Sequence, residues 1–308
     1  MSERRIILVT GSPRSGTTAV GQALSEGTGV CNLHEPFNYH VGLRSVQRYF
    51  EIPGSNGFSD EDLRQTVESI RRLRLRYKPG AFPGESGLRR FAKRVFGGRA
   101  VTWYRRCRFS PGVDTIIWKD PFACFFAAGL AEDHDVQVIV TLRNPWAVAG
   151  SFKRMGWAFD LADIHSRLSK AGVPGTRPLD QDTMCTRDPV RNGAAIWTLV
   201  YGVLEEARRR SAGQIRFLDL DRVVADPVPT FMGLYRDLDL PWSPRVERRI
   251  RLRYARREDW VSAPRAQRAH DQRRDLDAVN TYWRQLLDDD EVEVVTATSG
   301  SLWERLHR

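Results

Sequence analysis

Short hydrophobic runs alternate along the chain with longer amphipathic segments, and this alternation predicts strands separated by helices. The run Arg5–Thr10 is aliphatic and β-branched and ends at a glycine, which is typical of a buried parallel strand. From residue 17 the pattern becomes helical, with Val20 and Leu24 on one side. Further strands are predicted at 115–118, 136–142 and 214–218. Enough chain separates them for helical crossovers, so we expect an α/β fold: a single domain with a central parallel sheet flanked by helices.

A long interruption, about residues 38–112, lies between the first strand–helix unit and the strand at 115. Pro-Gly and Gly-Gly pairs mark several turns in it. It is too long for a plain connection, so we interpret it as a substrate-facing insertion with helices at 60–77 and 88–96. After Asp219 the pattern is mostly helical, most clearly at 230–238 and 276–287. We therefore expect residues 1–308 to form one domain that carries this insertion.

Charge is concentrated in one part of the chain. The net charge is +10, yet residues 71–108 alone contain thirteen lysines and arginines against a single acid, Glu85. Such a segment predicts an anionic partner, although an arginine-rich face that is simply solvated explains it equally well. No segment approaches the roughly 20 apolar residues of a membrane span. The four cysteines are too sparse and too widely spaced for a zinc cluster or a disulfide framework, so we expect a reduced, cytoplasmic setting.

The segment Gly11-Ser12-Pro13-Arg14-Ser15-Gly16-Thr17-Thr18 has the glycine spacing of a phosphate-binding loop. It joins the first strand to the first helix, so its backbone N–H groups and the helix N-terminus would face an anion. A nucleoside-triphosphate loop reads G-x-x-x-x-G-K-[ST], but Thr17 occupies the lysine position here. Arg14 supplies positive charge from inside the loop instead. The hydroxyls of Ser15, Thr17 and Thr18 add donors, so the loop suits a terminal diphosphate-like group.

A second candidate element is "VIVTLRNPWAVAGSF", residues 138–152. It predicts a strand that ends in Arg143-Asn144-Pro145 and continues into a helix begun by the proline. An arginine at the carboxyl end of a parallel strand lies on the edge where ligands bind. Ser151 is about two helical turns further on, so a ligand shared with Arg143 would lie along the first turns of this helix.

Together the two elements resemble the sulfotransferases that use 3′-phosphoadenosine 5′-phosphosulfate (PAPS). In that family a P-[KR]-S-G-T-[TS] loop binds the 5′-phosphosulfate, and a later arginine with a serine eight residues on binds the 3′-phosphate. The matching residues here are Pro13, Arg14, Ser15, Gly16, Thr17 and Thr18, followed by Arg143 and Ser151. Arginine in place of the loop lysine is similar to the carbohydrate and tyrosylprotein branches. The resemblance covers roughly residues 5–36 and 115–155, and it implies PAPS as co-substrate and no metal.

The resemblance also implies catalytic residues. Lys119, in "IIWKDP", is similar to the lysine that ends the corresponding strand in many family members, so we assign it to the leaving group together with Arg14. The histidine of the small-molecule cytosolic branch is absent, because Pro121 stands there. Glu35, in "CNLHEPFNYH", resembles the glutamate of the carbohydrate branch, and we choose it as the base, with a pKa raised by partial burial. His34 and His40 are the alternatives, and Asp120 would orient Lys119.

The predicted reaction is therefore sulfonyl transfer to a hydroxyl of a carbohydrate, a glycolipid or another small metabolite. The basic segment favours an anionic acceptor, or peripheral contact with a membrane through residues 88–96. No nucleic acid is expected, because no nucleic-acid-binding motif is present. The alternatives are a kinase-like phosphotransferase, for which Asp120 is the only candidate magnesium ligand, and a basic nucleic-acid or membrane-binding module. Residues 265–274 are a candidate loop over the 3′-phosphate, and Asp219 stands where many family members have a tyrosine.

Overall fold

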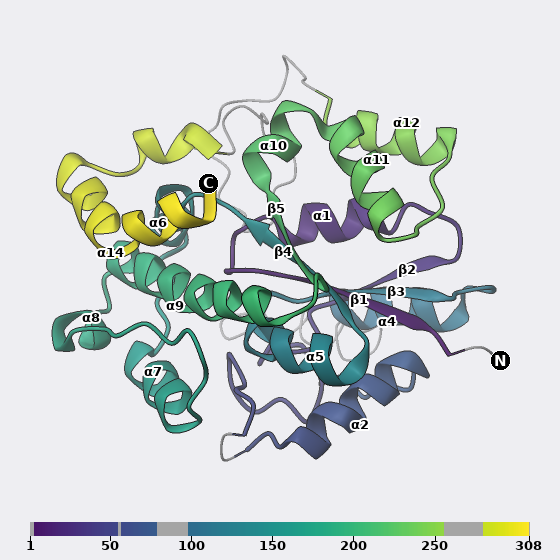
Figure 1. Ribbon diagram of the computed structural model, residues 1–308, viewed down its shortest axis with the longest axis horizontal. Helices are drawn as coiled ribbons and strands as arrows, with labels where there is room; N and C mark the ends of the chain where they lie inside the picture. The colour runs from purple at the N-terminus through teal and green to yellow at the C-terminus, as the bar shows by residue number, and fades with distance from the viewer. Residues whose placement is uncertain (1–2, 55–56, 79–97, 256–279, 308) are drawn as a thin grey trace, which may run out of the picture.

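A five-stranded parallel sheet forms the centre of the protein (Figure 1). The computed structural model describes residues 3–54, 57–78, 98–255 and 280–307. The strand order is β2-β3-β1-β4-β5. The strands are β1 (Arg5–Thr10), β2 (Val30–His34), β3 (Thr115–Lys119), β4 (Gln137–Leu142) and β5 (Ile215–Asp219). This confirms the predicted α/β fold with a central parallel sheet.

Both faces of the sheet are buried, because successive side chains of a strand point to opposite sides. In β1, Ile7 and Val9 join one hydrophobic cluster, whereas Ile6 and Leu8 join the other. The first face is covered by α1 (Thr17–Leu24), α11 (Pro227–Asp237) and α12 (Pro244–Arg253). The second face is covered by α2 (Asp60–Arg71), α5 (Ala127–His134) and α9 (Pro189–Arg210). This two-sided burial explains why the strands are nearly continuous hydrophobic runs.

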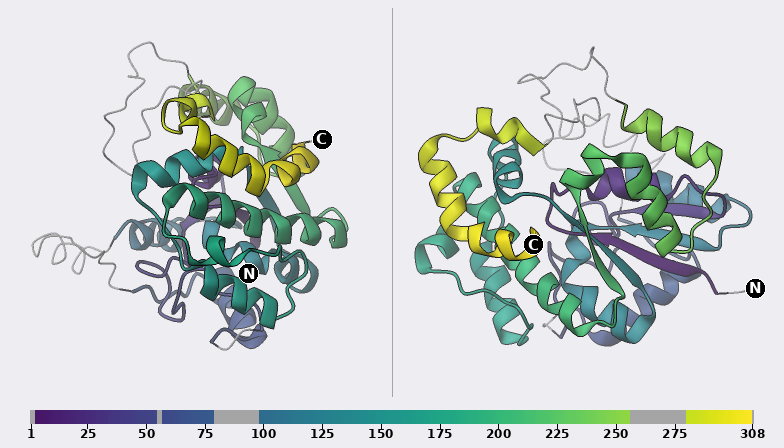
Figure 2. Two further views of the ribbon diagram at one scale, coloured as in Figure 1. Left: turned by 90° about the vertical axis from the view of Figure 1, so that its left-hand side faces the viewer. Right: turned by 45° about the horizontal axis from the view of Figure 1, so that its top comes forward.

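The remaining elements pack around this three-layer centre. Helix α14 lies beside α6 and α9 near the C-terminus (Figures 1 and 2). None of the described helices combines the length and apolar character needed to cross a bilayer. The other helices are α4 (Arg99–Phe109), α6 (Pro145–Met155), α7 (Leu161–Lys170), α8 (Gln181–Cys185), α10 (Leu220–Ala225) and α14 (Asp289–His307), with 3₁₀ helices η1 (Pro121–Phe126) and η2 (Tyr282–Gln285).

Several predicted helix limits were wrong. The helix expected at 60–77 ends at Arg71, because Leu73 adopts a left-handed φ of 50° and Tyr77 forms a β-bridge with Leu43. Helix α4 was not predicted. At the end of the chain, residues 282–285 form only a 3₁₀ helix, although 276–287 was expected to be helical. The predicted helix at 88–96 and residues 276–279 lie outside the described residues.

Candidate active site

The candidate residues gather at one edge of the sheet, where the parallel strands end. In the strand register, Lys119 of β3 lies opposite Val9 of β1 on one side and opposite His34 of β2 on the other. The phosphate-loop segment follows β1, Glu35 follows β2, and Arg143 follows β4. Four segments that are distant in sequence therefore meet at the carboxyl ends of neighbouring strands, the edge at which open α/β sheets bind ligands.

The glycine loop leads directly into α1. Gly16 is the N-cap residue, with a left-handed φ of 86° and no side-chain cap. A Cβ at Gly16 would lie 2.6 Å from two methyl carbons of Leu220 in α10, so only glycine fits without a shift. Arg14 also has a positive φ, 72°. The first N–H groups of a helix have no intrahelical acceptor, so this loop presents uncapped donors at the positive end of the α1 dipole.

Ser15 holds the loop against β4. Its Oγ is 2.7 Å from Thr141 Oγ1, and the Thr141 hydroxyl donates to the Thr10 carbonyl at 3.1 Å. Either hydroxyl can donate in the Ser15–Thr141 contact, and in both cases the contact joins the loop to β4. Gly11 permits this close approach, because a Cβ there would lie 2.6 Å from the Thr141 carbonyl oxygen. The buried Ser15 hydroxyl therefore fixes the loop, and its expected role as a donor to the ligand stays a prediction.

Arg14 connects the loop to the second candidate element. Its Nε donates to Ser151 Oγ at 2.8 Å, and its backbone carbonyl accepts from the Arg143 guanidinium at 2.8 Å. Arg143 and Ser151 are both largely buried. The arginine–serine pair is therefore joined through Arg14, and two guanidinium groups lie close to the N-terminus of α1. This concentration of positive charge and N–H donors suits an anion with more than one phosphate or sulfate group.

Helix α9 and a late residue hold this element in place. Trp197 donates its indole N–H to the Arg143 carbonyl at 2.8 Å, and Tyr201, one turn later, donates to the Thr141 carbonyl at 2.5 Å. The Arg143 Nε donates to Asn280 Oδ1 at 3.2 Å, and the Asn280 amide in turn contacts Asp221. Because these partners are buried, the backbone and the guanidinium of Arg143 are both oriented before any ligand arrives.

Lys119 and Glu35 form a buried ion pair. The Lys119 Nζ lies 2.5 Å from Glu35 Oε1, and the exposed fractions of the two side chains are 0% and 17%. The Lys119 stem lies under α1, where a Cβ on Gly21 would come within 2.9 Å of Lys119 Cγ. The small residue in α1 therefore makes room for a lysine that reaches from the sheet to the site.

The pKa expected for Glu35 is corrected by this pair. Burial raises the pKa of the carboxyl, but the charges of Lys119 and His34 and the hydrogen bonds from Lys119 and Asn38 outweigh burial. The pKa of Glu35 therefore lies well below its ordinary value rather than above it. Burial also lowers the pKa of Lys119, and the Glu35 charge opposes that effect. Glu35 is ionised while it contacts Lys119, so it can accept a proton but binds it weakly.

A tight turn presents the Glu35 carboxylate. Glu35 has a left-handed φ of 49°, its N–H donates to the Lys119 carbonyl at 2.8 Å, and Asn38 donates to its second oxygen at 2.8 Å. Asp120 supports the same turn by accepting from the Phe37 N–H at 2.5 Å, and it also accepts from the Phe122 N–H at 3.0 Å. Within the described part of the chain, the hydrogen bonds of Asp120 orient this turn rather than Lys119, in contrast to our expectation.

Asp120 is unsuited to a magnesium site. Both carboxylate oxygens already accept hydrogen bonds, and the side chain is fully buried. Burial raises the pKa of Asp120 to about 7, with smaller contributions from its neighbours. Among the described residues, no group of three or more His, Cys, Asp or Glu side chains is arranged to hold a metal ion.

The two histidines occupy different surroundings. The Nε2 of buried His34 lies 4.0 Å from Glu35 Oε1, so it is next to the ion pair. His40 instead packs among aromatic rings, with its ring centroid 5.5 Å from that of Tyr49. Burial and the nearby Lys78 charge lower the pKa of His40. Of the two histidines, His34 is the one whose ring nitrogen lies within ion-pair distance of Glu35 in the contacts described here.

Several residues of the site were missed by sequence reasoning. Asn38 binds Glu35, Asn280 binds Arg143, and Arg99 at the start of α4 is close enough for its charge to affect Lys119. Of these three residues, the sequence could have indicated only Asn38, because it follows Glu35 by three residues and lies in the same turn. Asp219 stands at the position where many members of the resembled family have a tyrosine. Here it caps α10 by accepting from the Asp221 N–H at 2.9 Å. The candidate loop 265–274 lies outside the described residues.

The family model described as "Sulfotransferase family" matches residues 7–244. Similar solved structures include the sulfotransferase domain from the curacin biosynthetic pathway, at 14% identity, with a TM-score of 0.47 and coverage of 96% of this chain and 98% of that one. Sulfotransferase STF9 from Mycobacterium avium is 17% identical, with a TM-score of 0.44 and coverage of 99% and 77%. Comparison with curated protein sequences finds no match. The family match spans most of the chain, including Arg14, Glu35, Lys119, Arg143 and Ser151, and the protein therefore belongs to the sulfotransferase family.

Proposed function

We propose that this sulfotransferase moves the sulfonyl group of PAPS to a hydroxyl of a carbohydrate, a glycolipid or another small metabolite. The observation that carries the proposal is the contact of the glycine loop with Arg143 and Ser151 through Arg14. It joins an uncapped helix N-terminus to two guanidinium groups. A ligand that bears a phosphosulfate and a separate phosphate matches such a pair of adjacent anion sites.

The donor would be held by the glycine loop at one end and by Arg143 and Ser151 at the other. The backbone N–H groups of residues 14 and 16–18, with the Thr17 and Thr18 hydroxyls, face the 5′-phosphosulfate in this proposal, Pro13 and Ser15 shape the loop, and Arg14 neutralises the anion. Arg143 and Ser151 take the 3′-phosphate, for which Arg143 is already oriented by Asn280. PAPS supplies an activated sulfonyl group, and no metal is needed because cations and N–H dipoles of the chain carry the charge that develops.

The Glu35–Lys119 pair suggests how removal of the acceptor's hydroxyl proton is coupled to departure of the phosphate. Lys119 is the nearest cation to Glu35, at 2.5 Å, and it would leave the carboxylate to neutralise the departing phosphate oxygen. Burial then acts on Glu35 without its main opposing charge, so the pKa of the carboxyl rises. Glu35 accepts the proton of the acceptor hydroxyl as the new O–S bond forms and the sulfur–oxygen bond to the phosphate breaks, which releases adenosine 3′,5′-bisphosphate.

The remaining sequence predictions concern partners and location. An anionic acceptor and peripheral membrane contact were inferred from the basic segment, of which residues 79–97 lie outside the described residues. The described part of that segment includes exposed arginines on α4 at 105, 106 and 108. A cytoplasmic setting is proposed from cysteine usage, and three of the four cysteines are buried free thiols.

Thermal unfolding with adenosine 3′,5′-bisphosphate tests donor binding. Without magnesium, the nucleotide should raise the melting temperature, because a ligand bound only to the folded state stabilises it. Arg14→Ala and Arg143→Ala should each abolish the shift, whereas Arg251→Ala, at an exposed arginine of α12, should retain it. Stabilisation by magnesium-ATP alone, or no shift at millimolar nucleotide, would contradict the proposal.

Turnover of Glu35→Gln tests the base. Glutamine keeps the size of the side chain but cannot take a proton, so sulfonyl transfer should fall about 100-fold or more, in the range of a lost general base. The thermal shift with adenosine 3′,5′-bisphosphate should remain. Near-normal turnover would assign the role to a histidine, and the matched variants His34→Gln and His40→Gln would identify which one.

A further inference from the structure

A row of aromatic rings connects the surroundings of Arg14 with those of Glu35. The Arg14 guanidinium carbon is 5.8 Å from the Trp157 ring centroid, and Phe152 links Trp157 to Phe159 with centroid distances of 6.1 and 5.9 Å. Phe159 is in edge contact with Tyr49, at 5.4 Å. Trp157, Phe159 and Tyr49 are partly exposed, whereas Phe152 is fully buried, so the row lies along the edge of the core and three of its rings reach the surface.

Tyr49 lies at the Glu35 end of this row. Burial and the negative charge of Glu35 raise the pKa of the Tyr49 phenol to about 12. The phenol is therefore uncharged at neutral pH, and its ring contacts Tyr39 and His40, which follow Glu35 by four and five residues. Tyr39 and His40 continue the row beyond it, with centroids 5.7 and 5.5 Å from that of Tyr49. An acceptor whose hydroxyl approaches Glu35 would thus pass along the face of Tyr49.

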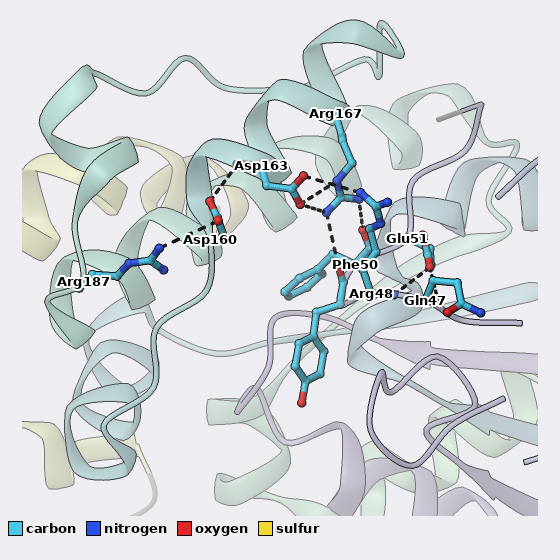
Figure 3. A network of polar contacts seen from close by, with 9 residues as sticks. Gln47, Arg48, Phe50, Glu51, Asp160, Asp163, Arg167 and Arg187 are labelled. Carbon is cyan, nitrogen blue, oxygen red and sulfur yellow. Dashed lines mark hydrogen bonds and ion pairs between the residues drawn. The ribbon is translucent and has the colours of Figure 1, made fainter. Parts of the chain in front are cut away.

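The backbone that carries Tyr49 is fixed by charged side chains from other parts of the fold (Figure 3). Arg167 of α7 donates to the carbonyls of Phe50 at 2.7 Å and Tyr49 at 3.4 Å. Asp163, one turn earlier in α7, pairs with the Arg167 guanidinium at 2.7 Å and keeps it oriented. The Arg167 side chain is only 11% exposed, so this contact is an anchor within the structure rather than a surface pair.

Two further charged residues secure the same loop. The Glu51 carboxylate, on a residue with 1% exposure, accepts from the N–H groups of Gln47 at 2.7 Å and Arg48 at 3.1 Å (Figure 3). Lys78 donates to the carbonyls of Tyr39 at 2.6 Å and Val46 at 2.5 Å. A loop without regular secondary structure is thus held at both ends, so the partly exposed Tyr49 ring has a defined position.

We infer that Tyr49 is an acceptor-contacting residue and that the acceptor carries its hydroxyl on a ring whose flat apolar face lies on the Tyr49 ring. This inference rests on the proposed function and names the class of acceptor. A phenol and a pyranose both offer such a face, since aromatic rings attract flat C–H and π surfaces at these spacings. A flexible chain has no flat face to match the row, so it gains less from the same contact. Arg167 is a positioning residue that acts through the loop.

Acceptor kinetics with PAPS and the full chain test the inference. The acceptors are 4-nitrophenol, methyl glucopyranoside and, as the chain-like control, hexan-1-ol. Tyr49→Ala should raise the KM of the ring acceptor that is used by about tenfold while kcat changes less than about twofold, since a stacking contact made in both ground and transition states is lost. Tyr49→Phe keeps the ring and should stay near wild type. Leu252→Ala removes an exposed apolar side chain of α12 and should change neither constant.

The position of the loop is tested separately. Arg167→Gln should raise the same KM several-fold, and Arg167→Lys, which can still donate to a carbonyl, should restore most of it. Binding of adenosine 3′,5′-bisphosphate by every variant shows that the donor site is folded. An unchanged KM for the ring acceptor in Tyr49→Ala, or a wild-type enzyme that prefers hexan-1-ol, would overturn the inference alone. A wild-type enzyme that transfers sulfonate from PAPS to none of the three would overturn the proposed function and this inference with it.

Discussion

The Glu35–Lys119 pair offers a quantitative test of the site's electrostatics. A double-mutant cycle would combine Glu35→Gln, Lys119→Met and the double variant. Lys119 is fully buried, so Glu35→Gln leaves its ammonium with an amide oxygen in place of a carboxylate. Removing one partner of a buried pair costs about 3 to 5 kcal/mol. Because glutamine still accepts a hydrogen bond, we expect a loss of about 3 kcal/mol in the free energy of unfolding.

The double variant should be more stable than the two single losses predict. With both charges removed, no buried ion lacks a partner, and methionine fills the space of the lysine stem. The interaction free energy should therefore exceed about 1.5 kcal/mol, within the range for residues in direct contact. Urea unfolding at pH 7, with linear extrapolation to water, measures all four free energies.

A matched exposed pair provides the control. Glu247 and Arg251 in α12 are 2.6 Å apart, close to the 2.5 Å of Lys119 and Glu35, but both side chains are exposed. Glu247→Gln should cost only about 0.3 to 0.5 kcal/mol, because solvent screens the pair. If the losses at Glu35 and Lys119 simply add, within about 0.5 kcal/mol, the buried-pair reasoning is refuted. The same result would contradict the proposal that Lys119 moves from Glu35 to the departing phosphate and so raises the pKa of Glu35.

Three further predictions concern residues that shape the site. Asp120→Asn should alter the pH dependence of stability: the folded pKa of about 7 lies above the ordinary 3.8, so the stability that Asp120 contributes is complete below about pH 4 and is lost as the pH rises through 7. Urea unfolding from pH 4 to 8 should show the wild type losing its advantage over the variant across that window, and parallel curves would contradict the assigned burial. Gly16→Ala should destabilise the protein by about 1 to 3 kcal/mol through its positive φ and its contact with Leu220, and more than Gly54→Ala, where the φ is 67° but a Cβ meets nothing within 4 Å. Equal losses in thermal melts would show that Leu220 does not crowd the loop. Trp197→Phe removes the hydrogen bond to the Arg143 carbonyl, so calorimetry should show weaker binding of adenosine 3′,5′-bisphosphate, and unchanged affinity would argue against a role in orienting Arg143.

The sequence by itself determined the sheet and the location of the site. Buried parallel strands need continuous hydrophobic runs, so β1 was predicted with its observed limits and β3 and β4 within one residue at either end. A glycine-rich turn between a strand and a helix presents backbone N–H groups at a helix N-terminus, which made the 11–18 loop recognisable as a candidate anion site. Strand-end residues such as Lys119 and Arg143 were placed correctly at one edge, because parallel strands all end there.

Only the tertiary structure decided which partner each group has. Lys119 and Glu35 are 84 residues apart in sequence, and their contact reverses the pKa direction that burial of the glutamate alone predicts. Ser15 is held by Thr141, a contact that exists only because β4 lies beside the loop. Local sequence indicates the chemical capacity of a side chain, whereas its pKa and available protons depend on neighbours brought by the fold. The placement of Tyr49 by Arg167 has the same origin, since neither the loop nor α7 indicates the other in sequence.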